Sequence, residues 1–108
     1  MAEATFVQEG DKVDYTPSSA VAAGQVVVQG DLVGVAVQAI EANKLGAIAV
    51  TGVFDVVKTT GAISAGTKVY WDDTNKYATT SATGTKYMGK AVKAAASADA
   101  TVRVRLEQ

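Results

Sequence analysis

The chain has 108 residues, a formal net charge of −1, no cysteine and no histidine. The missing cysteines exclude disulfides and thiolate metal sites, and the missing histidines remove the commonest general base and transition-metal ligand. We therefore expect no catalytic, cofactor-binding or metal-binding residues and no small-molecule substrate, and the near-neutral charge predicts no general affinity for nucleic acid.

Residues 1–16 predict an N-terminal arm followed by an edge strand. They lack the basic and apolar regions of a signal peptide, and no apolar run in the chain approaches the roughly 20 residues of a membrane helix, so we expect a soluble protein without membrane contact. Phe6 and Val7 are the only apolar anchors of the arm. Val13 and Tyr15 alternate with polar residues and predict the short strand. The arm is either a frayed terminus or a segment that orders on a partner.

The rest of the chain is expected to pack around residues 24–58. Both faces of the run 32–37 are apolar, so this strand should be buried on both sides, and Gly34 permits the close approach of another backbone. Short strands at intervals of roughly ten residues favour a sandwich or a small barrel over βαβ units. Glycine turns separate four such apolar runs: 26–28, 32–37, 47–50 and 53–57.

Residues 61–68 (GAISAGTK) have the glycine spacing of a phosphate-binding loop. That loop has lysine directly after its second glycine and opens a helix. Here Thr67 precedes Lys68, and a strand-like run follows. We therefore expect a structural turn at Gly66 rather than a nucleotide site.

Aromatic and acidic residues gather around the next turn. Asp72 and Asp73 are adjacent, so in a strand they point to opposite faces and cannot act as an acid/base pair. The DDTN sequence shares some ligands with a calcium loop but lacks its later glycine and glutamate, which favours turn residues bonded to their own backbone. Trp71 is expected in the core or at its rim. With three tyrosines it could also furnish an amphipathic contact patch: Tyr70, Tyr77 and Tyr87.

Loops and strands alternate in the next part of the chain. Residues 77–85 (YATTSATGT) are typical of an exposed hairpin or surface loop, and residues 88–93 resume a strand. Residues 94–99 (AAASAD) are too short for a helix that is stable alone, so a turn between two strands is favoured.

The final strand, residues 101–106, has the clearest half-buried pattern, with two valines and a leucine pointing inward. Arg103 and Arg105 share its outer face. They either pair with carboxylates of a neighbour or keep an edge strand soluble.

The charges are distributed unevenly along the chain. Residues 1–55 carry a net charge of −5, and residues 56–108 carry a net charge of +4. The opposite charges either neutralise each other across one globule or form a head-to-tail interface between copies, in which charge sets the register.

These patterns predict a mainly β protein: a single compact small barrel or sandwich of short strands with glycine turns and an extended N-terminal arm. We expect residues 1–16 to form the arm and edge strand, and residues 17–108 to form a single β domain. A chain of this length corresponds to one domain and can bury a core without disulfides or metals.

The succession of motifs resembles a family of small tailed-phage and prophage proteins that are regarded as capsid cement, or head decoration, proteins. Some members carry a RecA/RadA recombinase label. The resemblance covers residues 5–106. Its most specific parts are DYTP at 14–17, GDLVGVA at 30–36, GVFDV at 52–56 and VYWD at 69–72.

The resemblance implies a structural virion protein rather than an enzyme. It implies a homotrimer that is made in the bacterial host cytoplasm, binds the major capsid protein on the outside of the filled head and stabilises the lattice. Head decoration proteins of this kind often use an N-terminal arm that orders against the shell. Capsid or intersubunit contacts are therefore expected at Thr5, Phe6, Val7, Tyr15, Trp71, Arg103 and Arg105.

The sequence also bears on two other functions. A glycan- or protein-binding accessory module of a virion would use the Tyr/Trp patch and the threonine-rich loop. The recombinase label finds no support in the residues, because the chain has no intact phosphate-binding loop and is too short for a RecA core.

Overall fold

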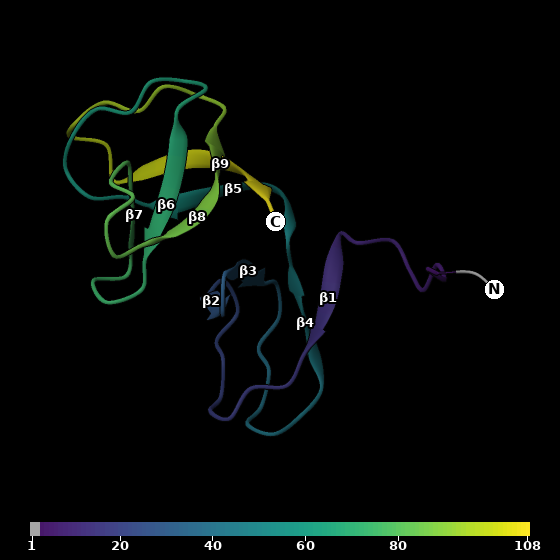
Figure 1. Ribbon diagram of the computed structural model, residues 1–108. Helices are drawn as coiled ribbons and strands as arrows, with labels where there is room; N and C mark the ends of the chain where they lie inside the picture. Colours follow the sequence, from purple (N-terminus) through teal and green to yellow (C-terminus); the bar gives the residue numbers. More distant parts are fainter. Residues whose placement is uncertain (1–2) are drawn as a thin grey trace.

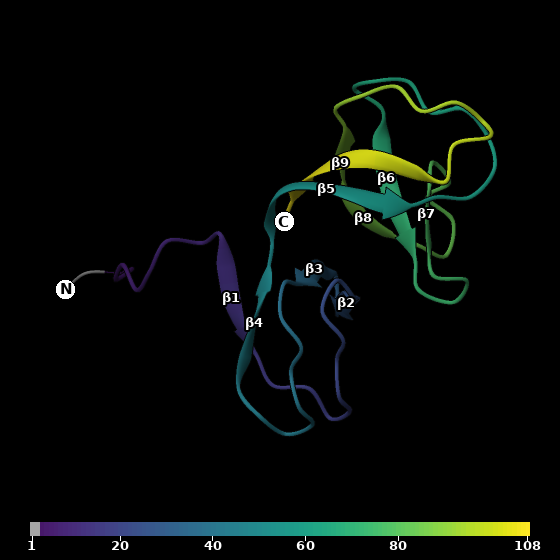
Figure 2. The same ribbon diagram turned by 180° about the vertical axis from the view of Figure 1, so that it is seen from behind.

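The computed structural model describes residues 3–108 and is an all-β protein. Within these residues the strands form two antiparallel sheets that pack against each other (Figure 1, Figure 2). The fold is a small β-sandwich, which confirms the predicted class. Its strands are β1 (Lys12–Tyr15), β2 (Val26–Gln29), β3 (Leu32–Ala36), β4 (Gly46–Ala49), β5 (Thr51–Val57), β6 (Lys68–Asp72), β7 (Tyr77–Thr79), β8 (Lys86–Ala91) and β9 (Thr101–Glu107).

The first sheet has the order β1-β4-β3-β2, with β1 at one edge and β2 at the other. A two-residue turn, Gly30-Asp31, joins β2 to β3, whose Gln29 and Leu32 are paired. Gly30 has a φ of 60°, which suits the first central position of a type II′ turn. The glycine turn expected here is present.

The chain crosses from the first sheet to the second at Val50. β4 ends at Ala49 and β5 begins at Thr51, so one extended segment supplies a strand to each sheet (Figure 1). Val50 is buried at this corner, and Gly52 just beyond it has a φ of 111°, which residues with a Cβ rarely adopt. Strands that change sheets through such a bend are typical of sheets packed across each other.

The second sheet has the order β5-β9-β8-β6-β7. Its longest pairing joins β5 to β9 from Thr51 opposite Glu107 to Val57 opposite Thr101. Beyond the end of β5, Lys58 meets β7 in a single parallel bridge. This bridge brings the two edge strands together at one end only, and the rest of the β5 edge has no partner strand, so the sheet curls without closing into a barrel.

The turn between β6 and β7 agrees with the sequence analysis. The Asp72 carboxylate accepts hydrogen bonds from the backbone N–H groups of Thr74 and Asn75, each at 3.0 Å. These bonds lower the pKa of Asp72, the one from Asn75 most. The acidic residues here hold a turn.

Residues 77–85 agree with the hairpin alternative, because the first three form β7, the second strand of the β6–β7 hairpin; only the expected exposure is wrong at Ala78. Ala78 pairs with Trp71 of β6 and is fully buried. Threonine and tyrosine are good strand formers, and a small alanine fits beneath the sheet. The high threonine content therefore reflects an edge strand as well as a loop.

The main core lies between the two sheets. Val33 and Val35 of β3 point into it, against buried residues of the second sheet that include Met88 and Leu106. Ala36 of β3 belongs instead to a smaller cluster on the opposite side of the first sheet. Strand β3 is thus buried on both faces, as its apolar pattern predicts.

The side chain of Gln108 joins the two sheets. Its Oε1 accepts a hydrogen bond from the N–H of Val33 at 2.8 Å, and its Nε2 donates to the carbonyl groups of Tyr87 and Met88 at 3.0 and 2.9 Å. The pairing of β3 with β4 ends at Val35, because β4 departs toward the second sheet. Gln108 supplies the acceptor that an adjacent strand would otherwise provide.

Lys58 is a buried lysine whose ammonium group binds backbone oxygens. It is 7% exposed, and its Nζ donates to the carbonyls of Thr59 and Gly61 at 2.9 Å and of Ser97 at 3.4 Å. These bonds connect the loop after β5 with the loop before β9.

The Lys58→Met variant keeps most of the apolar stem and removes the ammonium group. We expect it to lower the free energy of unfolding by about 1–3 kcal/mol, because the carbonyls lose a charged donor. Denaturant unfolding measures this change, and the exposed Lys68→Met is the matched control. Equal stability of the two variants would show that the loops do not depend on Lys58.

β8 and β9 approach each other closely at Gly89. A Cβ on Gly89 would collide with the backbone carbonyl of Arg105, which cannot rotate away. Only glycine fits this pairing without displacing a strand.

Gly89→Ala should therefore lower the free energy of unfolding by about 2 kcal/mol or more, because overpacking forces the strands apart. Thermal and denaturant unfolding measure the loss. Gly10→Ala is the matched control, since nothing lies within 4 Å of the Cβ position there. A Gly89→Ala protein as stable as this control would contradict the close approach.

Candidate binding surfaces

The N-terminal arm, defined here as residues 3–11, precedes β1 and is exposed along its whole length. Figures 1 and 2 show it running away from both sheets. Thr5, Phe6 and Val7 lie in it, and Phe6 and Val7 are 78% and 85% exposed. Residues 1 and 2 of the expected arm lie outside the described residues.

The base of the arm is fixed at Asp11. The carbonyl of Asp11 accepts a hydrogen bond from the N–H of Val50 at 2.9 Å, and its carboxylate accepts one from the hydroxyl of Thr51 at 3.1 Å. Gln8 bonds to the carbonyl of Lys12 at 3.0 Å. The exit direction of the arm is therefore set at the corner between the two sheets.

Tyr15 and Trp71 are both packed against apolar clusters. Tyr15 is half-buried at the end of β1 and packs on the smaller cluster. Trp71 is 5% exposed, and its Nε1 donates to Asp73 at 3.0 Å. The core position expected for Trp71 is confirmed, and its alternative place in an exposed aromatic patch is wrong, because β6 turns the indole between the sheets. A glycan-binding surface built on Trp71 loses its basis.

The arginines on β9 lie on the outer face of the second sheet. Arg103 forms a two-bonded ion pair with Asp55 of β5 at 3.0 and 3.3 Å, and Arg105 lies 3.7 Å from Glu107. The edge-strand interpretation of β9 is wrong, since β9 lies between β5 and β8. β5 and β9 lie far apart in the sequence, so the alternation within β9 could not show that the two strands pair.

Two of the ion pairs join the acidic half of the chain to the basic half. Asp31 in the β2–β3 turn meets Lys86 of β8 at 2.7 Å, and Asp55 meets Arg103. In both pairs the hydrogen bond to the base is the main cause that lowers the pKa of the carboxyl group. These contacts support the first interpretation of the uneven charges, in which opposite charges neutralise each other within one globule.

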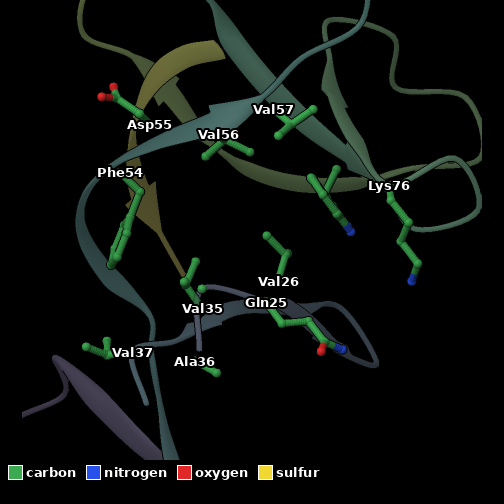
Figure 3. Close-up of a pocket in the computed structure, with 12 residues that line it drawn as sticks. Gln25, Val26, Val35, Ala36, Val37, Phe54, Asp55, Val56, Val57 and Lys76 are labelled. Carbon is green, nitrogen blue, oxygen red and sulfur yellow. The ribbon is translucent and has the colours of Figure 1, made fainter. Parts of the chain in front are cut away.

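An apolar groove of about 610 Å³ opens between the two sheets. Figure 3 shows Phe54 and Val56 of β5 on one side of it and Val26 and Val35 on the other. Trp71 also lines the groove. The main core continues into this opening, since Phe54 and Val26 are only partly buried against it.

Sequence reasoning missed this groove. Its walls come from strands that are far apart in the chain, so no local pattern marks it. One signal was available in the sequence: the run 53–57 would place valines on both faces of a strand. In the structure, Val53 and Val57 are more than half exposed.

Residues 3–108 contain no group of three or more His, Cys, Asp or Glu placed to hold a metal ion. The stretch 61–68 forms a loop that leads into β6, with Gly66 at a φ of 87°, as expected for a turn. In the part of the chain that is described, no helix has the length and apolar character needed to cross a bilayer.

The ion-paired carboxylates make the stability of the fold depend on pH in the acidic range. The pKa values of Asp31, Asp55 and Asp73 are lowered in the folded protein, so their stabilisation is present above the usual carboxyl pKa and is lost as the pH falls through the lowered values. We expect the thermal midpoint to be level down to about pH 5 and to fall below about pH 4. The fall should be smaller in Arg103→Gln, which releases Asp55. An identical pH profile would contradict the contribution of this pair.

The comparisons with known proteins identify a family. A family model described as phage cement protein matches residues 7–106, which include both sheets, the groove and the end of the arm. The chain matches no curated protein and no solved structure. The match covers nearly the whole chain and confirms the resemblance carried by the sequence motifs. The chain therefore belongs to the phage cement proteins, a family with a structural role in the phage capsid.

Proposed function

We propose that this protein binds the outside of the assembled phage head as a homotrimer and stabilises the capsid lattice through contacts with the major capsid protein. Membership of the phage cement family over residues 7–106 carries the proposal. Synthesis in the cytoplasm of the bacterial host and the absence of enzyme activity belong to the same proposal. An alternative glycan-binding role has no comparable support, because Trp71 is buried.

The proposed mechanism is mass action. A protein that binds only the assembled lattice shifts the equilibrium toward that lattice, by an amount set by its concentration relative to its dissociation constant. Trimers multiply the effect, because each additional contact on the same lattice becomes intramolecular. Many modest contacts can then oppose the pressure of packaged DNA.

The arm and the outer face of the second sheet are the proposed contact surfaces. Phe6 and Val7 expose apolar side chains and belong to neither apolar cluster of the described residues, which favours a role in association. Arg103 and Arg105 offer cationic groups on one sheet face. Their partial pairing with carboxylates suits contacts that give specificity more than affinity.

Removal of residues 1–9 tests the arm. Removing residues 1–16 would also delete β1 and uncover β4, so the cut is placed before Asp11, whose bond to Val50 is kept. We expect the truncated protein to remain folded by circular dichroism and to lose co-sedimentation with expanded phage heads.

Leu45→Ser is the matched control, because it removes an exposed apolar side chain from the β3–β4 loop instead of the arm. It should bind the heads like the unaltered protein. Full binding by the truncated protein would overturn the assignment of the arm.

A further inference from the structure

One edge of β5 borders the apolar groove and pairs with no described strand between Gly52 and Val56; beyond it, Lys58 bridges Ala78 of β7, and the N–H of Thr59 bonds to the carbonyl of Ala78. The N–H of Lys58 bonds to Ala100 just before β9, so the alternate residues 53, 55 and 57 direct their backbone groups to the opposite edge. Four consecutive residues, 54–57, line the groove. Neighbouring side chains in a strand point to opposite faces, so four consecutive residues can line the groove only if the edge of the strand faces it.

The groove face of β5 is apolar along this edge, and on the outer face two valines flank Asp55, which is paired with Arg103. Phe54 and Val56 face the groove, while Val53 and Val57 are 55% and 58% exposed on the other face. An unpaired edge with exposed valines favours the addition of another strand. A strand that fits here needs apolar side chains on both of its faces.

The arm has this character. Thr5, Phe6 and Val7 are consecutive strand formers that lie in no strand. In an extended segment Phe6 would point to one face and Val7 to the other. The arm also carries three acids and no base, and the charged groups beside the edge are Asp55, which is paired with Arg103, and Lys76.

We propose that the arm of one copy adds to the free edge of β5 in a second copy as an antiparallel strand. Phe6 lies over the groove opposite Phe54, and Val7 lies on the outer face opposite Val53. Antiparallel pairing matches every strand pair of both sheets. This inference rests on the proposed function, which gives the arm a role in association, and it names the surface that the arm binds.

The geometry favours another copy over the arm's own groove. The bonds of Asp11 to Val50 and Thr51 fix the base of the arm next to the start of β5. From that point β5 and the arm run in opposite directions in both Figure 1 and Figure 2. An arm that leaves its own β5 in this way presents its apolar residues to a neighbour.

The contact is heterologous, because it joins an arm to a groove rather than like to like. Such contacts close into a ring when the rotation between copies allows it. A ring of three copies satisfies every arm and every groove in the proposed trimer.

Cross-linking between two single-cysteine variants tests the exchange, because the chain has no native cysteine. Val7→Cys and tagged Val53→Cys are mixed over increasing concentrations and treated with a short thiol-to-thiol cross-linker. Only a contact between copies can join the two proteins. The control is a mixture of Val7→Cys with Leu45→Cys, because Leu45 lies outside the groove and is 71% exposed. We expect a higher yield of mixed dimer with Val53→Cys than with this control.

A mixed dimer no more abundant than in the Leu45→Cys control, at every concentration, would overturn the proposal. So would a double variant, Val7→Cys with Val53→Cys, that cross-links only within single chains, because the arm would then occupy its own groove. When the cross-linking is repeated with phage heads present, capture of the major capsid protein at Val53→Cys in place of a second copy would likewise overturn the proposal.

Light scattering supplies an independent measurement. Phe6→Ala should weaken self-association at least about tenfold, because the burial of a phenylalanine side chain is lost. Leu45→Ala, with an equivalent apolar loss elsewhere, should leave it unchanged. Equal association of the two variants would count against the proposal.

The two proposals fail in different ways. Arm exchange without co-sedimentation on phage heads would leave the inference standing and remove the capsid function. Capsid binding without arm-to-groove cross-links would do the reverse.

Discussion

The segment that runs from β4 through Val50 into β5 belongs to both sheets, and the remaining strands are placed by it. β1 and β3 pair with its first half, and β9 pairs with its second half. The bend at Gly52 therefore determines how the sheets face each other, and with them the buried residues of the main core. A residue with a Cβ at Gly52 would have to adopt a conformation that L amino acids disfavour. This one backbone constraint connects local chain geometry to the whole sandwich.

The same bend explains why the core is incomplete. The sheets come together where β3 meets β8, and Gln108 bonds to both strands there. Toward β2 and β5 the sheets diverge, and the apolar side chains between them line an open groove. The protein thus has apolar surface available for association without exposing its central core.

Much of the fold follows from sequence patterns that act locally. Apolar alternation in the last strand and the continuous apolar run of β3 reflect burial on one and on two faces, and glycines mark the turns. Local patterns do not report which strands become neighbours, so the alternation of β9 leaves open whether this strand lies at an edge. Trp71 shows the same limit: an aromatic residue is equally typical of a core and of a contact surface, and only the direction of β6 decides between them.

Of the candidate contact surfaces, the arm can be predicted from the sequence and the groove cannot. Phe6 and Val7 stand out in the sequence because nothing nearby can cover them. The groove and the free edge of β5 depend on strands from distant parts of the chain, so they emerge only once the chain is folded. Gly89 illustrates the limit at a single position, because its role depends on the backbone of Arg105 across a strand boundary.

The buried ammonium group of Lys58 has a practical consequence for chemical probing. Amine-directed reagents need a free, accessible amine, and the Nζ of Lys58 is enclosed by three carbonyl groups, whereas Lys68 is exposed. Acylation of Lys58 therefore requires the loops around it to separate. Its labelling rate, followed by peptide mass spectrometry, reports how often that end of the sandwich opens, with the exposed lysines as internal standards. The native chain thus contains its own reporter of local opening.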